Sequence, residues 1–170
     1  MLSEEAVGGA IATRSDFESF YEAHERRLFG TLCLVTGDRS EAEELMQEAF
    51  LKMWERWDRL GDIEDLSAYL YRTAFNLFRS RLRRTMRAAR RAIRPEHSVD
   101  AFERIDDRED LLAALRTLSP RQRAAVVLLD LLDLPSKEAG QVLGVKAVTV
   151  RTLASQARHA LRGVMGEPDG

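Results

Sequence analysis

The sequence is poor in the residues that disulfides and metal sites need. Its 170 residues include a single cysteine, Cys33, so no intramolecular disulfide can form and a reducing compartment is expected. The three histidines, His24, His97 and His159, are scattered and have no partner at metal-ligand spacing. We therefore predict no metal site and no cofactor.

Long apolar runs and catalytic motifs are also missing. No run approaches the ~20 apolar residues that span a bilayer, and there is no basic stretch followed by an apolar one near residue 1. No nucleophile is paired with a base, and Gly8–Gly9 does not lie between a strand and a helix, so it is not a phosphate loop. These absences predict a cytoplasmic protein that does not insert into a membrane and is not an enzyme.

The distribution of charge is more informative than its sum. Glycine and proline are few while Leu, Ala, Arg and Glu are many, which is typical of an all-helical protein. The net charge is only −2, yet residues 1–65 hold 7 basic and 16 acidic groups, and residues 66–95 hold nine arginines and no acid. Residues 96–110 hold 2 basic and 7 acidic groups, and residues 111–170 hold 8 and 5. Two acidic segments therefore alternate with two basic ones.

The strongest signal is the stretch from Leu66 to Pro95, in which a helix is expected to run to Arg94 and to stop at Pro95. One broad arc of it is apolar, and this arc consists of Leu70, Tyr71, Ala74, Phe75, Leu77, Phe78 and Leu82. The opposite strip consists of Arg72, Asn76, Arg79, Arg83 and Arg90. Because a run of like charges repels itself unless an anion neutralises it, we predict that this helix contacts nucleic acid.

Two segments are expected before this helix. Residues 1–14 show no periodicity and predict a disordered tail. A helix is expected over residues 16–35, ended by Gly37, and Ser40 with Glu43 predicts a capping box at the start of the next one. The apolar stripe expected in that second helix consists of Ala42, Leu45, Met46, Ala49, Phe50, Met53, Trp54 and Trp57. Its exposed side consists of Glu44, Gln47, Glu48, Leu51 and Glu55.

The C-terminal part reads as a separate module. Residues 95–109 combine high charge with weak periodicity and predict a flexible acidic linker, followed by a module over residues 110–166. Ser119 with Gln122 predicts a capping box, and a short helix, a turn at Gly144 and a longer helix predict a helix-turn-helix. Residues expected to face inward on the last helix are Val150, Leu153, Ala154, Ala157, Leu161 and Val164. Those expected outside are Arg151, Thr152, Ser155, Gln156, Arg158, His159 and Arg162.

Three stretches, in this order, resemble an extracytoplasmic-function sigma factor, the minimal promoter-specificity subunit of bacterial RNA polymerase. They are GDRSEAEELMQEAFLKMWERW, SAYLYRTAFNLFRSRLRR and LSPRQRAAVVLLDLLDLPSKEAGQVLGVKAVTVRTLASQARHAL. The resemblance covers about residues 16–94 and 110–165. It implies an all-α fold of two small helical domains, a sigma region 2 bundle and a region 4 helix-turn-helix, joined by the flexible acidic linker.

The resemblance also implies partners and site residues. The residues that would dock on the clamp helices of the polymerase largest subunit are Glu44, Gln47, Glu48 and Leu51. Those that would hold the minus-ten element, by its phosphates and by an unstacked base, are Asp62, Arg72, Asn76, Arg79 and Arg83. Those that would read the minus-thirty-five duplex are Lys146, Thr149, Arg151, Thr152, Ser155, Arg158 and Arg162. The polymerase flap and an anti-sigma factor are further expected partners.

The last helix departs from the family pattern. Lys146 stands where the family usually has a Ser or Thr cap, and TVRTLASQAR replaces the more basic TVKSRLxRAR. Two arginines of that pattern are absent, at Leu153 and Gln156. Fewer cations predict weaker phosphate binding and a shallower salt dependence.

Two other functions remain open at this point. A stand-alone helix-turn-helix regulator that never binds polymerase would be a dimer and would bind duplex DNA tightly, but it leaves the acidic side of the second helix without a role. A degenerate sigma-like protein that acts by protein contact alone would account for the thinned recognition helix.

Overall fold

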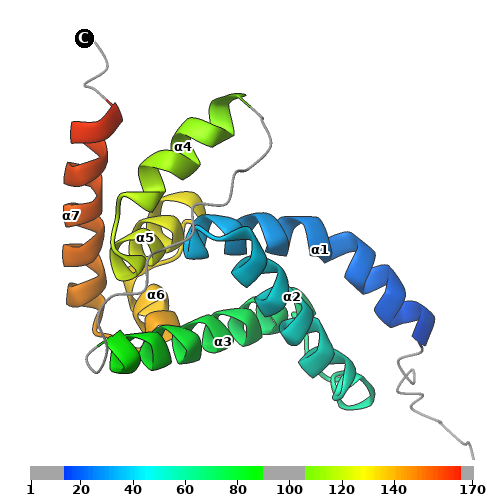
Figure 1. Cartoon of the computed structure of the whole chain (residues 1–170). Helices are drawn as coiled ribbons and strands as arrows, with labels where there is room; N and C mark the ends of the chain where they lie inside the picture. The colour runs from blue at the N-terminus through cyan, green and yellow to red at the C-terminus, as the bar shows by residue number, and fades with distance from the viewer. Residues whose placement is uncertain (1–13, 90–105, 166–170) are drawn as a thin grey trace, which may run out of the picture.

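The computed structural model describes residues 14–89 and 106–165, and all regular elements within these ranges are helical (Figure 1). The expected all-α fold is therefore confirmed. The predicted tail, up to residue 13, and residues 90–105 of the predicted helix end and linker lie outside the described residues. The elements are α1 (Arg14–Thr36), α2 (Arg39–Trp54), η1 (Trp57–Arg59), α3 (Leu66–Ala89), α4 (Asp106–Arg116), α5 (Pro120–Val126), the π-helical turn η2 (Val127–Leu131), α6 (Ser136–Leu143) and α7 (Ala147–Met165).

The first module packs α1, α2 and α3 around one apolar core. Leu28 of α1, Leu45 and Met53 of α2, and Leu70 of α3 are fully buried. The ring of Phe17 lies 5.0 Å from that of Trp57, in an edge-on contact that joins the start of α1 to η1, the short helix that follows α2. Because the apolar stripe of α2 faces this core, its acidic side is turned to solvent.

The second module is built on α5, α6 and α7. Ser119 and Gln122 form the predicted capping box at the start of α5. In the helix-turn-helix, Gly144 adopts a left-handed conformation with φ 67°, as the expected turn requires. The turn can pack closely against α6 because residue 140 is a glycine. A Cβ at Gly140 would lie only 2.7 Å from the carbonyl oxygen of Val145.

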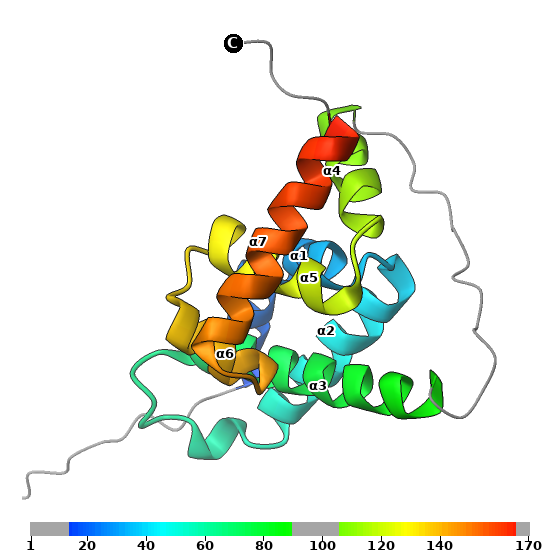
Figure 2. The same ribbon diagram turned by 90° about the vertical axis from the view of Figure 1, so that its left-hand side faces the viewer.

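The two modules pack directly against each other. This contact was not expected from the prediction of a flexible linker between them. The C-terminal half of α1 contacts α5, and α3 runs beneath α6 (Figures 1 and 2). Buried residues of both modules, among them Leu28, Val35, Ala124 and Leu128, belong to one continuous apolar cluster. The chain is thus two sequence modules within one packed body.

Four local predictions need correction. The N-cap of α2 is Asp38 rather than Ser40: its backbone is extended and its side chain accepts from the Glu41 amide, so α2 begins before Ser40. Helix α4 begins at residue 106, so the last four residues of the predicted linker are helical. Trp54 is 44% exposed and Val164 is 55% exposed. Helical periodicity predicted that Trp54 and Val164 face the core. Periodicity alone does not show whether a neighbouring helix extends far enough to cover a side chain.

Candidate functional site

The acidic strip, defined as Glu44, Gln47, Glu48 and Leu51, lies on the solvent side of α2. Leu51 is 55% exposed, and Trp54 follows it one turn further along the helix. The two apolar side chains give the end of this strip a hydrophobic surface beside its carboxylates. This combination suits a protein partner with a basic and partly apolar face.

Arg81 of α3 reaches across to this strip. Its Nη1 donates to Glu44 Oε2 at 2.8 Å and its Nη2 donates to Glu48 Oε2 at 3.3 Å. Burial acts to lower the pKa of Arg81, but its hydrogen bonds to the carboxylates of Glu44 and Glu48 outweigh this effect and raise that pKa above its ordinary value. The strip is therefore partly neutralised from within the first module, a pairing that the sequence did not reveal.

The arginine strip of α3, defined as Arg72, Asn76, Arg79 and Arg83, follows one side of the helix as predicted. The side chains of Arg72, Asn76 and Arg83 are exposed, and Asp62 is exposed in the loop before α3. The helix begins where Asp65 Oδ1 accepts from the Ala68 amide at 2.8 Å. These residues offer guanidinium groups for phosphates, with an amide and a carboxylate for base edges.

Arg79 differs from the rest of the arginine strip because it is partly buried by the second module. Its Nη1 donates to the carbonyl oxygen of Gln141 in α6 at 3.2 Å, and its Nε is buried without a partner. A Cβ on Gly144 would lie 3.0 Å from Arg79 Cδ. Arg79 is thus covered by the helix-turn-helix.

The outer face of α7 carries the residues expected to read duplex DNA. The exposed members are Lys146, Thr149, Arg151, Thr152, Ser155, Arg158 and Arg162. Arg151 Nη1 donates to Ser136 Oγ at 3.0 Å, which orients it beside the start of α6. The face is polar and rich in cations, and the small side chain of Ser155 allows the helix to approach a DNA groove closely.

Arg158 is held by a carboxylate from η2. Its Nε donates to Asp130 Oδ2 at 2.8 Å and its Nη2 to Asp130 Oδ1 at 2.6 Å, a bidentate geometry. The hydrogen bonds with Asp130 raise the pKa of Arg158. One cation of this face is therefore compensated inside the protein, and the sequence pattern of α7 alone gave no sign of it.

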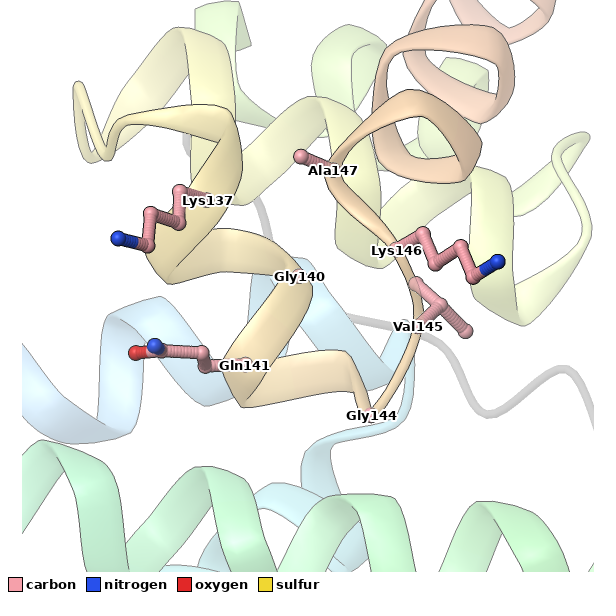
Figure 3. A pocket seen from close by; sticks show the side chains of 7 residues that line it. All are labelled: Lys137, Gly140, Gln141, Gly144, Val145, Lys146 and Ala147. Carbon is pink, nitrogen blue, oxygen red and sulfur yellow. The ribbon is translucent and has the colours of Figure 1, made fainter.

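The helix-turn-helix also encloses a shallow hollow (Figure 3). It is lined by Lys137, Gly140, Gln141, Gly144, Val145, Lys146 and Ala147. The side chains of Lys137 and Lys146 point to opposite sides, so their charges do not converge on one ligand. We assign no small-molecule site here.

Neither a metal site nor a membrane span is found in the part of the chain that the structure describes. No group of three or more His, Cys, Asp and Glu side chains in residues 14–89 and 106–165 is placed to hold a metal ion. In the same part of the chain, none of the helices combines the length and the apolar character that a membrane span requires.

Comparison with protein families finds two matches in this chain. Residues 20–88 match sigma-70 region 2, and residues 108–161 match sigma-70 region 4. The first match ends at α3 and the second begins at α4, so the two matched regions correspond to the two modules of the fold.

Three sigma factors of other bacteria are similar to this chain in sequence. The RNA polymerase sigma-E factor of Streptomyces avermitilis is 30% identical, over 86% of this chain and 83% of its own length. The SigE factor of Mycolicibacterium smegmatis is 29% identical, over 97% and 70%. SigG of Mycobacterium tuberculosis is 28% identical over 89% of this chain, which spans only about half (49%) of SigG.

Two solved structures share the fold. The sigma factor RpoE of Bartonella quintana, in complex with the anti-sigma factor NepR, gives a TM-score of 0.66 at 23% identity, over 91% of this chain and 99% of its own. CnrH, in complex with the cytosolic domain of CnrY, gives 0.60 at 19% identity, over 95% and 94%. At these identities the likeness establishes the fold of the chain.

Proposed function

The chain belongs to the extracytoplasmic-function sigma factors, and from this premise we propose that it directs promoter-specific transcription initiation as a subunit of bacterial RNA polymerase. It binds core polymerase, opens the minus-ten element and reads the minus-thirty-five element. The observation that carries the proposal is the presence of three charged surfaces on one chain, each with most of its residues exposed: the acidic strip of α2, the arginine strip of α3 and the outer face of α7.

The acidic strip is the proposed contact with the clamp helices of the largest polymerase subunit. Glu44 and Glu48 meet basic side chains there, while Leu51 contributes apolar area. Charge complementarity of this kind raises the association rate and fixes orientation more than it raises affinity. Trp54 is a further exposed residue beside this contact and extends its apolar part.

The arginine strip is the proposed minus-ten surface. Arg72, Arg79 and Arg83 neutralise backbone phosphates, while Asn76 and the loop at Asp62 receive an unstacked base of the non-template strand. Flipping a base out of the duplex costs a few kcal/mol, which hydrogen bonding and stacking in a pocket offset. Opening is thus driven by differential binding of the single strand.

The outer face of α7 is the proposed minus-thirty-five reader. Arg151, Arg158 and Arg162 bind phosphates or guanine edges, and the hydroxyl groups of Thr149, Thr152 and Ser155 contact base edges in the major groove. Lys146, at the start of α7, binds a phosphate. In the assembled enzyme this second module also contacts the polymerase flap.

We also propose an anti-sigma factor as a partner and the cytoplasm as the location. Two proteins that share this fold, RpoE and CnrH, have been solved in complex with NepR and with the cytosolic domain of CnrY, respectively. An inhibitor of this type would cover the polymerase-binding and promoter-binding surfaces.

The test is co-migration with bacterial core polymerase on gel filtration, at moderate and at high salt, followed by a promoter-opening assay. The double variant Glu44→Lys/Glu48→Lys should lose polymerase binding, while Glu22→Lys, an exposed reversal on α1, should retain it. Reversal of Arg72 and Arg83 to Glu should retain polymerase binding and abolish opening. Absence of wild-type co-migration, with tight duplex binding by the free protein, would favour the stand-alone regulator instead.

A further inference from the structure

Val148 is an exposed apolar residue on the face of α7 that we propose reads duplex DNA. It is 56% exposed, whereas the inward-facing Val150 and Ala154 of the same helix are fully buried. Its neighbours one turn along the helix, Arg151 and Thr152, are exposed and polar. Val148 therefore lies outside the apolar core and presents an isopropyl group among polar side chains.

The position of Val148 along α7 brings it within reach of a DNA groove. A recognition helix contacts base edges with its N-terminal residues, and Val148 is the second residue of α7. Val164, another exposed valine of α7 at 55%, comes 16 residues later, about 24 Å further along the axis at ~1.5 Å per residue. Helix α7 lies at the edge of the molecule, with its start beside the turn that follows α6 (Figure 1). A duplex that meets this start contacts Val148 and does not reach Val164.

Hydrogen bonds within the second module fix the side chains around Val148. Thr152 Oγ1 donates to the carbonyl oxygen of Val148 at 3.0 Å, so its hydrogen is used inside the helix. Thr152 is left with a methyl group and an acceptor oxygen to present. Arg151 Nη1 is held by Ser136 Oγ at 3.0 Å. A valine in a helix has one strongly preferred rotamer, so the isopropyl group of Val148 also occupies a defined position.

A pyrimidine 5-methyl group is the partner that fits this apolar point. Each base shows a distinct set of groups in the major groove, and of the four unmodified bases only thymine shows a methyl group there. Apolar side chains contact this methyl group, which removes apolar surface on both sides from water. Cytosine carries a hydrogen atom at C5, so the same valine would cover less apolar surface on it.

We propose that Val148 is a specificity-determining residue that selects a thymine at one base pair of the minus-thirty-five element, by apolar contact with its 5-methyl group. The arginines of the same face hold the duplex by groups that every sequence carries, so they position α7 without choosing this base. The inference rests on the proposed reading of duplex DNA by α7 and deepens it.

The test first finds a bound sequence and then removes single methyl groups from it. Duplexes with a randomised stretch are selected by the full chain, both alone and assembled with core polymerase, and core polymerase alone gives the background. Each thymine of the selected site is then replaced in turn by deoxyuridine, which lacks only the methyl group. Binding is measured by fluorescence anisotropy. Because burying one methyl group is worth about three- to fourfold in affinity, one replacement should weaken binding by about that factor.

Variants of the two exposed valines connect this effect to Val148. In Val148→Ala the thymine and deoxyuridine duplexes should bind with nearly equal affinity at the sensitive position. Val164→Ala, which shortens the other exposed valine of α7, is the matched control and should keep the wild-type ratio. Alanine favours helix more than valine, so Val148→Ala should fold, and circular dichroism checks this. An apolar contact releases no counter-ions, so the ratio should be the same at low and high salt while both affinities fall.

The outcomes separate this inference from the proposed function. A selected site without a methyl-sensitive thymine would overturn the inference, as would a sensitivity that persists undiminished in Val148→Ala, or a chain that selects no sequence in either form. Each of these results can occur in a chain that still binds core polymerase. A chain that fails to bind polymerase, yet alone selects a site with a Val148-dependent thymine, would support the inference and refute the proposed function.

Discussion

Replacing Arg81 with alanine should change stability and polymerase binding in opposite directions. The side chain of Arg81 is 25% exposed, and it holds Glu44 and Glu48, which are 63% and 40% exposed. Exposed ion pairs contribute about 0.2–1 kcal/mol each, and the loss of the arginine stem from the α2–α3 contact adds to this. We expect Arg81→Ala to lower the free energy of unfolding by about 1–2 kcal/mol in urea titrations followed by circular dichroism.

The effect on polymerase arises because two carboxylates lose their internal counter-ion. The negative potential of the acidic strip then rises, which should speed association with a basic surface several-fold at low ionic strength and hardly at all at high ionic strength. Stopped-flow association with core polymerase at both ionic strengths measures this. Arg84→Ala, which removes an exposed neighbour on α3, is the matched control and should not accelerate association.

A double-mutant cycle decides whether the bridge exists in solution. Comparing Arg81→Ala, Glu44→Gln and the double variant isolates the coupling between the two groups, and we expect at least about 0.5 kcal/mol. A coupling of zero, together with an unchanged association rate in Arg81→Ala, would refute the reasoning. It would mean that the carboxylates of the acidic strip are not paired with Arg81 in solution and contact polymerase with their full charge.

Three further predictions concern other parts of the chain. Ser119→Ala removes the capping box of α5 and should cost ~1 kcal/mol of unfolding free energy in the same urea titrations. Burial, with a smaller contribution from Asp38, raises the pKa of Glu41, and Arg81 only partly opposes this. As pH rises, the unfolded chain therefore releases the Glu41 proton at a lower pH than the folded chain does. At neutral pH, where Glu41 is charged in both states, its charge lowers the free energy of unfolding. Glu41→Gln should exceed the wild type in thermal stability there and lose this advantage as pH falls through the folded pKa; an advantage independent of pH would contradict the assignment. Asp130→Asn frees Arg158 and should steepen the salt dependence of binding to a non-specific duplex by about 0.9, measured by fluorescence anisotropy, whereas equal slopes would show that the Asp130 bridge does not withhold Arg158 from phosphates.

The sequence predicted best those features that depend on neighbours a few residues away. The start of α3 at Leu66, the Ser119 capping box and the left-handed turns at Gly37 and Gly144 each follow from local hydrogen bonding or helical periodicity. The exposed strips of α2, α3 and α7 follow from the same periodicity, because burying one face of a helix fixes the direction of the other. The DNA and polymerase roles of these strips stay predictions.

Competing local signals explain one error. Asp38 and Ser40 are both good N-cap residues, and Glu43 favoured Ser40 by completing an S-x-x-E pattern. In the fold, Thr36 Oγ1 accepts from the Asp38 amide at 3.1 Å, which sets the turn after Gly37 and places Asp38 at the cap. The outcome depended on how α1 ends, which the pattern at the start of α2 does not contain.

The partners of arginines are beyond any local pattern. Arg81 pairs with a residue 37 positions away, Arg158 with one 28 positions away, and Arg123 with one 88 positions away. Arg81 and Arg158 belong to helices that the sequence assigned to nucleic acid, and Arg123 lies in the basic segment 111–170. Only the packing of α3 on α2, of α7 on η2 and of α5 on α1 reveals which cations are already satisfied.

This internal use of arginine changes what the charge pattern of the chain means. Acidic and basic segments alternate along the sequence, and in the fold they partly meet: carboxylates of α2 face Arg81 of α3, and Asp130 faces Arg158 of α7. Arg79 is engaged by the carbonyl of Gln141 rather than by an anion. The surfaces that the chain would offer to polymerase and promoter are therefore in part occupied by the chain itself. Binding an external partner then means exchanging internal contacts for external ones, which favours a partner that offers several contacts at once over a partner that offers one.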